Sequence, residues 1–391
     1  MSASIGSSRL RGPFVLALAL VALNMRVVFA SLPPLLGQVR DELGLSAAVA
    51  GLLTAGPILC FGLLAPVVPR LVARTAVERL VGWCAALTAA GAALRGMGGT
   101  AGLFAGTLLA GAAVAVGQGV VPVLLRARFA GGLGLLTGIF TAGLTVGATL
   151  AAATSVPLAD ALGSWQAALA AYGLVGAAAA VTWSLARGAS TIVPRGAPVG
   201  LQRSTRAWSV AVYFGLQSMA FYCGLTWLPS ILRDDGYSEA AAGALQALGN
   251  AVQFLPALAV PVLAGRRDSQ TAILVVLVAT AVVGLVGLLA APGAAAAWMC
   301  LVGVAQGGCF GLGLVLPVLR GRGAYAVASL TAMTLSVGYL IASLGPSLLG
   351  LAHDVSGRWS LVLVLLVVIT LAELPPGVLA TRRWKIGLED G

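Results

Sequence analysis

The stretch GLSAAVAG at residues 44–51 recurs as GYSEAAAG at residues 236–243, an offset of 192 positions in a chain of 391 residues. At the same offset, Pro69 corresponds to Pro261. Self-similarity at a fixed and long period indicates repeated structural units rather than a chance motif. The chain is therefore expected to consist of two related halves.

Further residues correspond along the rest of the chain, at offsets between 188 and 194. The pairs are Arg74 with Arg266, 118–119 with 306–307, 144–147 with 335–338, and Asp160, Gly163 and Trp165 with Asp354, Gly357 and Trp359. Their order is the same in both halves, so we expect the two units to run in the same direction. We place the first half at 1–186, a linker rich in Gly, Pro and Arg at 187–206, and the second half at 207–391.

The composition places most of this chain in a lipid environment. Hydrophobic residues make up 59% and charged residues 9%, whereas a soluble domain has about 25% charged residues. A bilayer requires about 20 apolar residues for each helical span. Apolar stretches of that size lie at 13–32, 46–68, 77–94, 100–125, 133–156, 165–186, 207–229, 239–264, 271–291, 294–318, 324–350 and 359–380. The predicted fold is an all-α membrane protein with twelve spans in two pseudo-symmetric six-helix bundles.

The basic residues orient these spans. If the amino terminus is cytoplasmic, 18 of the 23 Lys and Arg residues fall inside, and Arg26 lies within the first span. The outer loops then hold Arg40, Arg95, Arg233 and Arg358. Such a skew follows the positive-inside rule and predicts that both termini are cytoplasmic. Because the net charge of +11 is spread over short loops, we expect membrane lipid and no nucleic acid as a partner.

The sequence indicates no catalytic centre, metal site or cofactor. The five cysteines lie inside apolar runs and lack the spacing of metal ligands. A membrane enzyme would need clustered acids, histidines or metal ligands near the membrane surface. Asp234 and Asp235 are the one acidic cluster, and a solvated loop explains them.

Parallel halves of six helices are an architecture of transporters, which bind solute near the bilayer midplane between the halves. Arg26 lies about midway along the first span, just after Asn24. An intramembrane charge is costly and suggests function, and a guanidinium suits carboxylate-like anions. We therefore expect Arg26, with Asn24, to bind an anionic solute. The alternative is a structural arginine that is satisfied by backbone carbonyls or by a gate contact.

Other polar residues fall on the spans expected to line the same cavity. Aligning 32–33 with 228–229 places Tyr222 opposite Arg26, in a polar and aromatic patch. The further candidates for substrate binding are Gln118, Gln217, Phe221, Gln306 and Tyr339. For the glutamines, hydrogen bonds that hold helices together are an equal alternative.

Charged residues in the loop between the second and third spans are candidates for a gate. Arg70, Arg74 and Glu78 could close the inner side by ion pairs, although membrane orientation alone could explain the arginines. Among the acids, Glu373 alone lies within a span, and the one histidine is His353. The spans therefore contain few ionisable side chains that could form a proton relay. This favours exchange, facilitated diffusion or co-transport with a protonated solute.

Several stretches resemble the cyanate and 2-nitroimidazole transporter family of the major facilitator superfamily. They are 22–26, 32–35, 215–218, 221–222, 227–229, 337–340, 344–346 and 350–354. The family usually has proline where this chain has Val27, and often glutamine where it has Val337.

The resemblance implies a carrier of a small solute in the bacterial inner membrane, such as cyanate, another small anion or a nitroimidazole. We expect it to act as a monomer. Two alternatives stay open: an exporter of neutral drug-like compounds, and a membrane sensor of solute.

Overall fold

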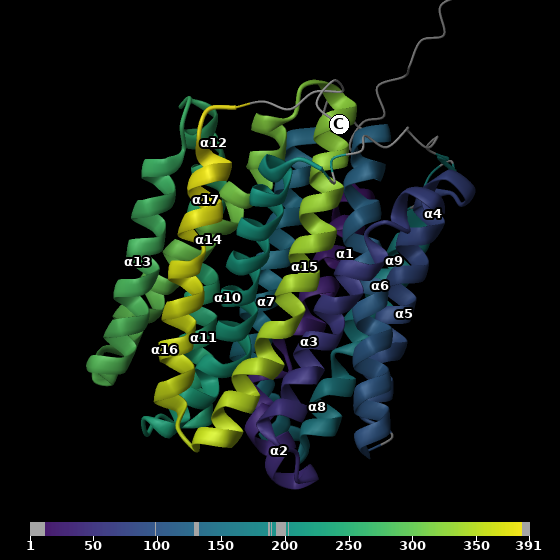
Figure 1. Ribbon diagram of the computed structural model, residues 1–391. Coiled ribbons are helices and arrows are strands. Elements are labelled where there is room, and N and C mark those ends of the chain that lie inside the picture. Colours follow the sequence, from purple (N-terminus) through teal and green to yellow (C-terminus); the bar gives the residue numbers. More distant parts are fainter. Residues whose placement is uncertain are drawn as a thin grey trace, which may run out of the picture.

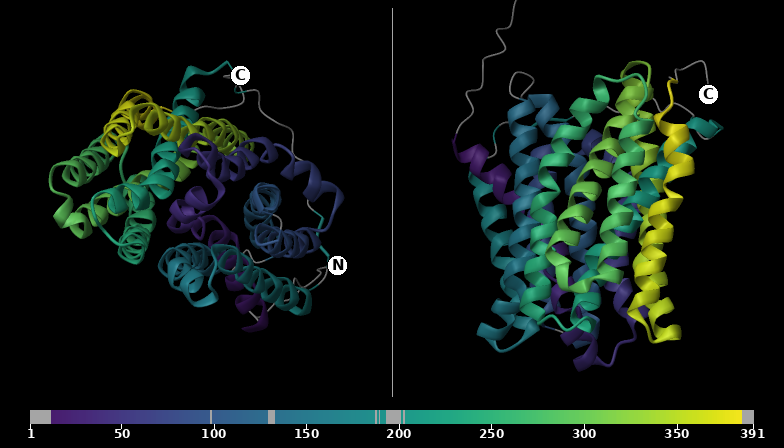
Figure 2. Two further views of the ribbon diagram at one scale, coloured as in Figure 1. Left: turned by 90° about the horizontal axis from the view of Figure 1, so that it is seen from below. Right: turned by 90° about the vertical axis from the view of Figure 1, so that its left-hand side faces the viewer.

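The computed structural model describes residues 12–97, 99–128, 133–186, 188, 190–192, 201 and 203–384, and its elements are all helices (Figure 1). Helices of the first half gather beside those of the second half (Figure 2). Two ends of this body are distinguished below. The terminal end is where α1 begins and α17 finishes, and the α2 end is opposite it.

The first bundle contains the helices from α1 to α9. Their bounds are α1 (Gly12–Ala30), η1 (Pro33–Leu35), α2 (Leu36–Leu43), α3 (Ala47–Leu64), α4 (Val68–Arg74), α5 (Val77–Arg95), α6 (Gly99–Arg128), α7 (Leu133–Leu162), α8 (Trp165–Ala171) and α9 (Gly173–Ala186).

The second bundle contains the helices from α10 to α17. Their bounds are α10 (Thr205–Asp234), α11 (Glu239–Val252), α12 (Phe254–Gly265), α13 (Thr271–Ala290), η3 (Pro292–Ala294), α14 (Ala295–Arg320), α15 (Gly323–Ser356), α16 (Trp359–Ala372) and α17 (Leu374–Thr381).

In the described residues, eleven segments are long and apolar enough to cross a membrane. The 30-residue helix α10 is the remaining long one, and it carries polar groups such as Gln217, Ser218 and Thr226. It packs against α14 to α17. The predicted all-helical membrane fold is thus confirmed, and α10 completes the pattern of twelve spans.

Three spans expected to be continuous are interrupted. The breaks lie at Tyr172 between α8 and α9, at Gln253 between α11 and α12, and at Glu373 between α16 and α17. Pro256 follows the second break and Pro375 the third. Proline cannot donate the backbone hydrogen bond that would continue the preceding turn, which favours a break at these points.

The repeated sequence builds the same local structure twice. The side chains of Ser46 and Ser238 cap α3 and α11, each accepting a hydrogen bond from the backbone N–H three residues later. Gly44 and Gly236 stand two residues earlier with φ of 61° and 94°, which residues with a side chain rarely adopt. The two copies therefore begin their second spans with one and the same turn and cap.

Glycines at four-residue intervals bring helices into close contact, as in other membrane bundles. A Cβ atom on Gly303, Gly307 or Gly311 of α14 would clash with the backbone of α11 and α12. At Gly307 the clash would be with the carbonyl oxygen of Gln253. These glycines place α14 directly against the break between α11 and α12.

Hydrogen bonds join the two bundles at the α2 end. The Asp354 carboxylate, at the end of α15, accepts from the backbone N–H groups of Ala47 (2.9 Å) and Ala48 (2.7 Å) in the first turn of α3. Nearer the centre, the Thr226 hydroxyl donates to the Thr54 hydroxyl at 3.0 Å. Anionic groups are favourable at helix N-termini, so Asp354 ties α15 of one bundle to α3 of the other.

Arg95 does not lie in an exposed outer loop as expected. It ends α5 with only 2% of its surface exposed. Its Nη1 donates to the Val28 carbonyl at 2.7 Å, and its Nε donates to the Thr107 hydroxyl at 3.0 Å. Because α1 ends at Ala30, carbonyls in its last turn lack helical partners, and the Arg95 guanidinium supplies one.

Candidate functional site

A cavity of about 790 Å³ lies between the two bundles. The first bundle contributes residues of α1 and α7 to its lining, and the second contributes residues of α10, α11, α12 and α14. Arg26 is the one charged residue among the described residues that line it. A concave site with few polar groups on largely apolar walls is typical of small-molecule binding.

The Arg26 guanidinium faces aromatic side chains of the opposite bundle. Its Cζ atom lies 6.0 Å from the centroid of the Phe221 ring, and the group is next to the Tyr222 hydroxyl. None of the ion pairs formed by the described residues includes Arg26. The positive charge is thus supported by a ring face and a hydroxyl and is not neutralised by a carboxylate.

The two candidate tyrosines form one aromatic cluster behind this cation. The Tyr222 ring lies 5.1 Å from the Phe221 ring and 6.4 Å from the Tyr339 ring, centroid to centroid. Tyr339 in turn packs on Phe61 of α3 at 4.9 Å. Both tyrosines are buried. Tyr222 lines the cavity, whereas Tyr339 supports it from the side of α3.

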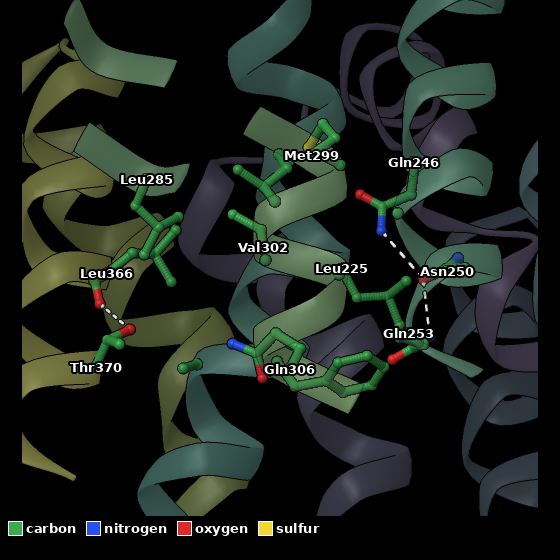
Figure 3. A pocket seen from close by; sticks show the side chains of 16 residues that line it. Leu225, Gln246, Asn250, Gln253, Leu285, Met299, Val302, Gln306, Leu366 and Thr370 are labelled. Carbon is green, nitrogen blue, oxygen red and sulfur yellow. Dashed lines mark hydrogen bonds between the residues drawn. The ribbon is translucent and has the colours of Figure 1, made fainter. Parts of the chain in front are cut away.

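The candidate glutamines of the second bundle bind each other. Gln217 Nε2 donates to Gln306 Oε1 at 3.2 Å, and Ser218 Oγ donates to Gln217 Oε1 at 3.3 Å. Gln217 lines the Arg26 cavity, and Gln306 lines a neighbouring cavity shown in Figure 3. The two side chains therefore act as helix-to-helix contacts and as cavity lining at once.

Two candidates of the first bundle lie apart from the cavity. Asn24 is buried with 1% of its surface exposed, and its Oδ1 would lie 2.9 Å from a Cβ atom on Gly176 of α9. Gln118, on α6, is partly buried and is not among the residues that line the Arg26 cavity. Side chains two residues apart on an α-helix point in nearly opposite directions, because successive residues are rotated by about 100°. Helix α1 therefore directs Arg26, but not Asn24, toward the second bundle.

The proposed clamp between Arg70, Arg74 and Glu78 does not form in this structure. Glu78 is buried and accepts hydrogen bonds from the Thr191 backbone N–H and hydroxyl, both at 2.8 Å, and from Arg128 Nη1 at 3.4 Å. Arg70 and Arg74 are exposed. Glu78 thus fastens α5 to α6 and to the segment after α9, all on the side of the first bundle.

Sequence reasoning missed three amide side chains on the eighth span. Gln246 and Asn250 belong to α11, and Gln253 occupies the break before α12. Asn250 and Gln253 line the Arg26 cavity, and all three line its neighbour (Figure 3). Their spacing of four and three residues puts them on one helix face, and this pattern could have identified them.

Comparison with known proteins identifies the architecture. Residues 14–346 match the family model described as Major Facilitator Superfamily. The chain belongs to the major facilitator superfamily. It is 33% identical to the 2-nitroimidazole transporter of Escherichia coli (strain K12), over 97% of this chain and 98% of that protein. It is 31% identical to the cyanate transport protein CynX of the same organism, over 92% and 97% of the two chains.

Solved structures agree with this assignment. A bacterial homolog of the human lysosomal transporter Spinster, in an inward-facing and unoccupied conformation, superposes with a TM-score of 0.79. That comparison covers 98% of this chain and 99% of the other at 16% sequence identity, so it bears on the fold alone. The resemblance to the cyanate and 2-nitroimidazole transporter family is confirmed, and this major facilitator protein is a multi-pass membrane transporter.

Proposed function

We propose that this transporter carries a small anionic solute, and that Arg26 binds its negative charge. The observation that carries the proposal is the cavity between the bundles, where Arg26 is the one charged lining residue described and has no acidic partner. An anion in such a site neutralises a charge that the protein leaves uncompensated. A cation would meet repulsion, and no described carboxylate lines the cavity to offset it.

The aromatic and amide groups around Arg26 complete the proposed site. Phe221 and Tyr222 offer ring surfaces, and Gln217 offers an amide, beside the guanidinium. In a partly dehydrated cavity the attraction between Arg26 and an anion is stronger than in water. We propose Tyr339 and Gln306 as supporting residues of the same site, since each contacts a lining side chain.

Transport by this site would follow alternating access. The bundles, 1–186 and 207–391 joined through 187–206, would rock about the cavity. The hydrogen bonds of Asp354 with α3 hold the bundles together at the α2 end. With the termini cytoplasmic, as the distribution of basic residues favours, this corresponds to closure on the outer side of the bacterial inner membrane. For coupling, we propose exchange, facilitated diffusion or co-transport with a protonated solute, because Arg26 is the one charged residue among the described residues that line the cavity.

A second candidate solute is a neutral nitroimidazole. The similarity to a 2-nitroimidazole transporter favours it, and the Phe221, Phe254 and Phe310 side chains provide apolar lining for a flat ring. A nitro group is strongly dipolar, and its oxygens could accept hydrogen bonds from Arg26 without carrying net charge. The charge of the bound solute therefore separates the two candidates.

Ligand-dependent thermal unfolding of the purified protein tests the proposal. Cyanate, small carboxylates, 2-nitroimidazole and a quaternary ammonium ion would be compared on wild type, Arg26→Gln and the exposed control Arg126→Gln. A ligand at 100 times its Kd stabilises the folded state by about 2.7 kcal/mol. We expect an anion to stabilise wild type and Arg126→Gln but not Arg26→Gln. Stabilisation by neutral or cationic compounds alone, unaffected by Arg26→Gln, would overturn the anion proposal.

A further inference from the structure

A second, narrower cavity adjoins the Arg26 cavity on the side of the second bundle (Figure 3). The two cavities share Phe221, Leu225, Asn250 and Gln253 as lining residues. Most of the other residues that line the second cavity are apolar, and they come from α10, α13, α14 and α16. A molecule longer than a triatomic anion could thus extend from Arg26 into a second, uncharged compartment.

Two buried amides in this compartment have unpaired polar atoms. Gln246 and Asn250 expose 5% and 3% of their surface, and neither Gln246 Oε1 nor Asn250 Nδ2 has a hydrogen-bond partner. The remaining atoms are engaged, because Asn250 Oδ1 accepts from Gln246 Nε2 at 3.4 Å and from Gln253 Nε2 at 3.5 Å. The Gln246 oxygen points into the cavity (Figure 3).

The presence of one unpaired donor and one unpaired acceptor does not depend on how the side-chain amides are oriented. If all three side-chain amides were flipped, the mutual hydrogen bonds would be kept with donors and acceptors exchanged. One acceptor and one donor would still be unpaired, on residues one helical turn apart. Buried polar groups are almost always hydrogen-bonded, so an unpaired acceptor and an unpaired donor on two residues that line one cavity point to a ligand that supplies both partners.

We propose that Gln246 and Asn250 form a second subsite, which binds an uncharged hydrogen-bonding end of the substrate. The proposal rests on the proposed function, with the anionic group of the same molecule at Arg26. The substrate class that follows is a flat organic monoanion whose far end both donates and accepts a hydrogen bond, as the N–H and ring nitrogen of an azole do. The apolar residues Leu285, Met299 and Val302 suit the flat body of such a molecule.

The subsite also predicts selectivity. A site built to hydrogen-bond its ligand discriminates strongly against an analogue of equal size that lacks the polar group, because buried protein groups are then left unpaired. We expect a triatomic anion such as cyanate to bind at Arg26 without entering the second cavity. Its binding should therefore be independent of Gln246, which lines the second cavity and not the Arg26 cavity.

The test compares two five-membered-ring carboxylates at pH 8: imidazole-4-carboxylate, which carries the donor and acceptor, and thiophene-3-carboxylate, which lacks them. Dissociation constants would be measured for these two and for cyanate on wild type, Asn250→Leu, Gln246→Leu and Gln166→Leu, a control outside both cavities. We expect wild type and the control to prefer the imidazole compound by about tenfold or more. Each subsite variant should bring that ratio close to one, and Gln246→Leu, at a residue that lines the second cavity and not the Arg26 cavity, should leave cyanate binding unchanged.

Several results would overturn the subsite. Equal binding of the two ring compounds by wild type would do so, as would a preference that survives both subsite variants. Binding of cyanate but of neither ring compound would show that the second cavity takes no part of a ligand. The proposed function fails separately, when Arg26→Gln binds all three anions as wild type does. A variant that does not fold is recognised by its unliganded unfolding temperature, and the other subsite variant then decides.

Discussion

Glu78 of α5 binds Arg128 of α6 at the terminal end of the first bundle, and 192 residues later Gln270 binds Arg320 at the same end of the second. The positions correspond in the repeat, and so does the geometry of an arginine that joins two helices. The chemistry differs, because the first pair has a carboxylate and the second has a neutral amide with the carbonyls of Ala380 and Thr381.

The cavity shows a related division between the bundles. The first bundle contributes the cation Arg26, whereas the second contributes the aromatic and amide side chains of α10 and α11. In both places the repeat determines where a polar side chain lies, and the residue type determines what it does there. Pseudo-symmetry therefore guides the search for functional positions and does not predict that paired positions share a role.

The largest expected effect is a difference in stability between variants of Arg320 and Arg128. Arg320 is 4% exposed, and Arg320→Met would remove the donor of the Gln270 Oε1 atom and of the Ala380 carbonyl, whereas the Thr381 carbonyl still accepts from the Gln270 backbone N–H. We expect a loss of about 3–5 kcal/mol, as when one member of a buried polar pair is removed. The matched change Arg128→Met removes a side chain that is 24% exposed and leaves the buried Glu78 carboxylate with Thr191 as its donor, so it should cost about 1–3 kcal/mol.

The measurement is thermal or denaturant unfolding of both variants in the same detergent. A loss for Arg128→Met as large as that for Arg320→Met would show that burial does not distinguish the two pairs. The ion pair of Arg128 with Glu78 would then contribute as much to stability as the buried hydrogen bonds of Arg320 with neutral acceptors.

A smaller effect is expected at the α2 end, where the repeat pairs Asp354 with Asp160. Asp354→Asn replaces one of the two oxygens that accept from Ala47 and Ala48 with an N–H donor, and it removes a charge at the N-terminus of α3. We expect the equilibrium between closed and open α2 ends to shift by about 1–2 kcal/mol, roughly tenfold. Asp160 is exposed, so Asp160→Asn should leave the equilibrium unchanged.

Distances between spin labels on Leu162→Cys and Val355→Cys, which are exposed positions on opposite bundles, would report this shift in a background without Cys60 and Cys300. The longer distance should gain population in Asp354→Asn alone. An equal response to both aspartate variants would indicate a general charge effect instead of a specific contact.

The smallest effect is expected from replacing the carboxylate of the first bundle with an amide, as in the corresponding pair of the second bundle. Glu78→Gln keeps the shape but offers one acceptor oxygen to Thr191 and Arg128 in place of two. A lost hydrogen bond of this kind costs about 1 kcal/mol, with Arg128 still able to reach water. Unfolding temperature measures it, and a loss comparable to that of Arg320→Met would mean that charge dominates over geometry at this end.

Much of the architecture could be predicted from the sequence because its causes are local. Span length follows from bilayer thickness, and the repeat at 44–51 and 236–243 led directly to two copies of one capped helix start. Arg26 could be identified in the same way, since a charge in an apolar run is visible without a structure. Its proximity to Tyr222 followed from aligning the two halves.

Other features were decided by tertiary packing alone. The rotation of a helix about its own axis cannot be read from its amino-acid composition. In α1 this rotation points Arg26 toward the second bundle and Asn24 toward α9. The partner of Glu78, the burial of Arg95 and the unpaired amides of Gln246 and Asn250 likewise depend on neighbours distant in sequence. The sequence by itself determined which helices exist and how they repeat, because hydropathy and capping act within a few residues. The facing of each polar side chain was decided by the tertiary structure, because it depends on contacts between helices.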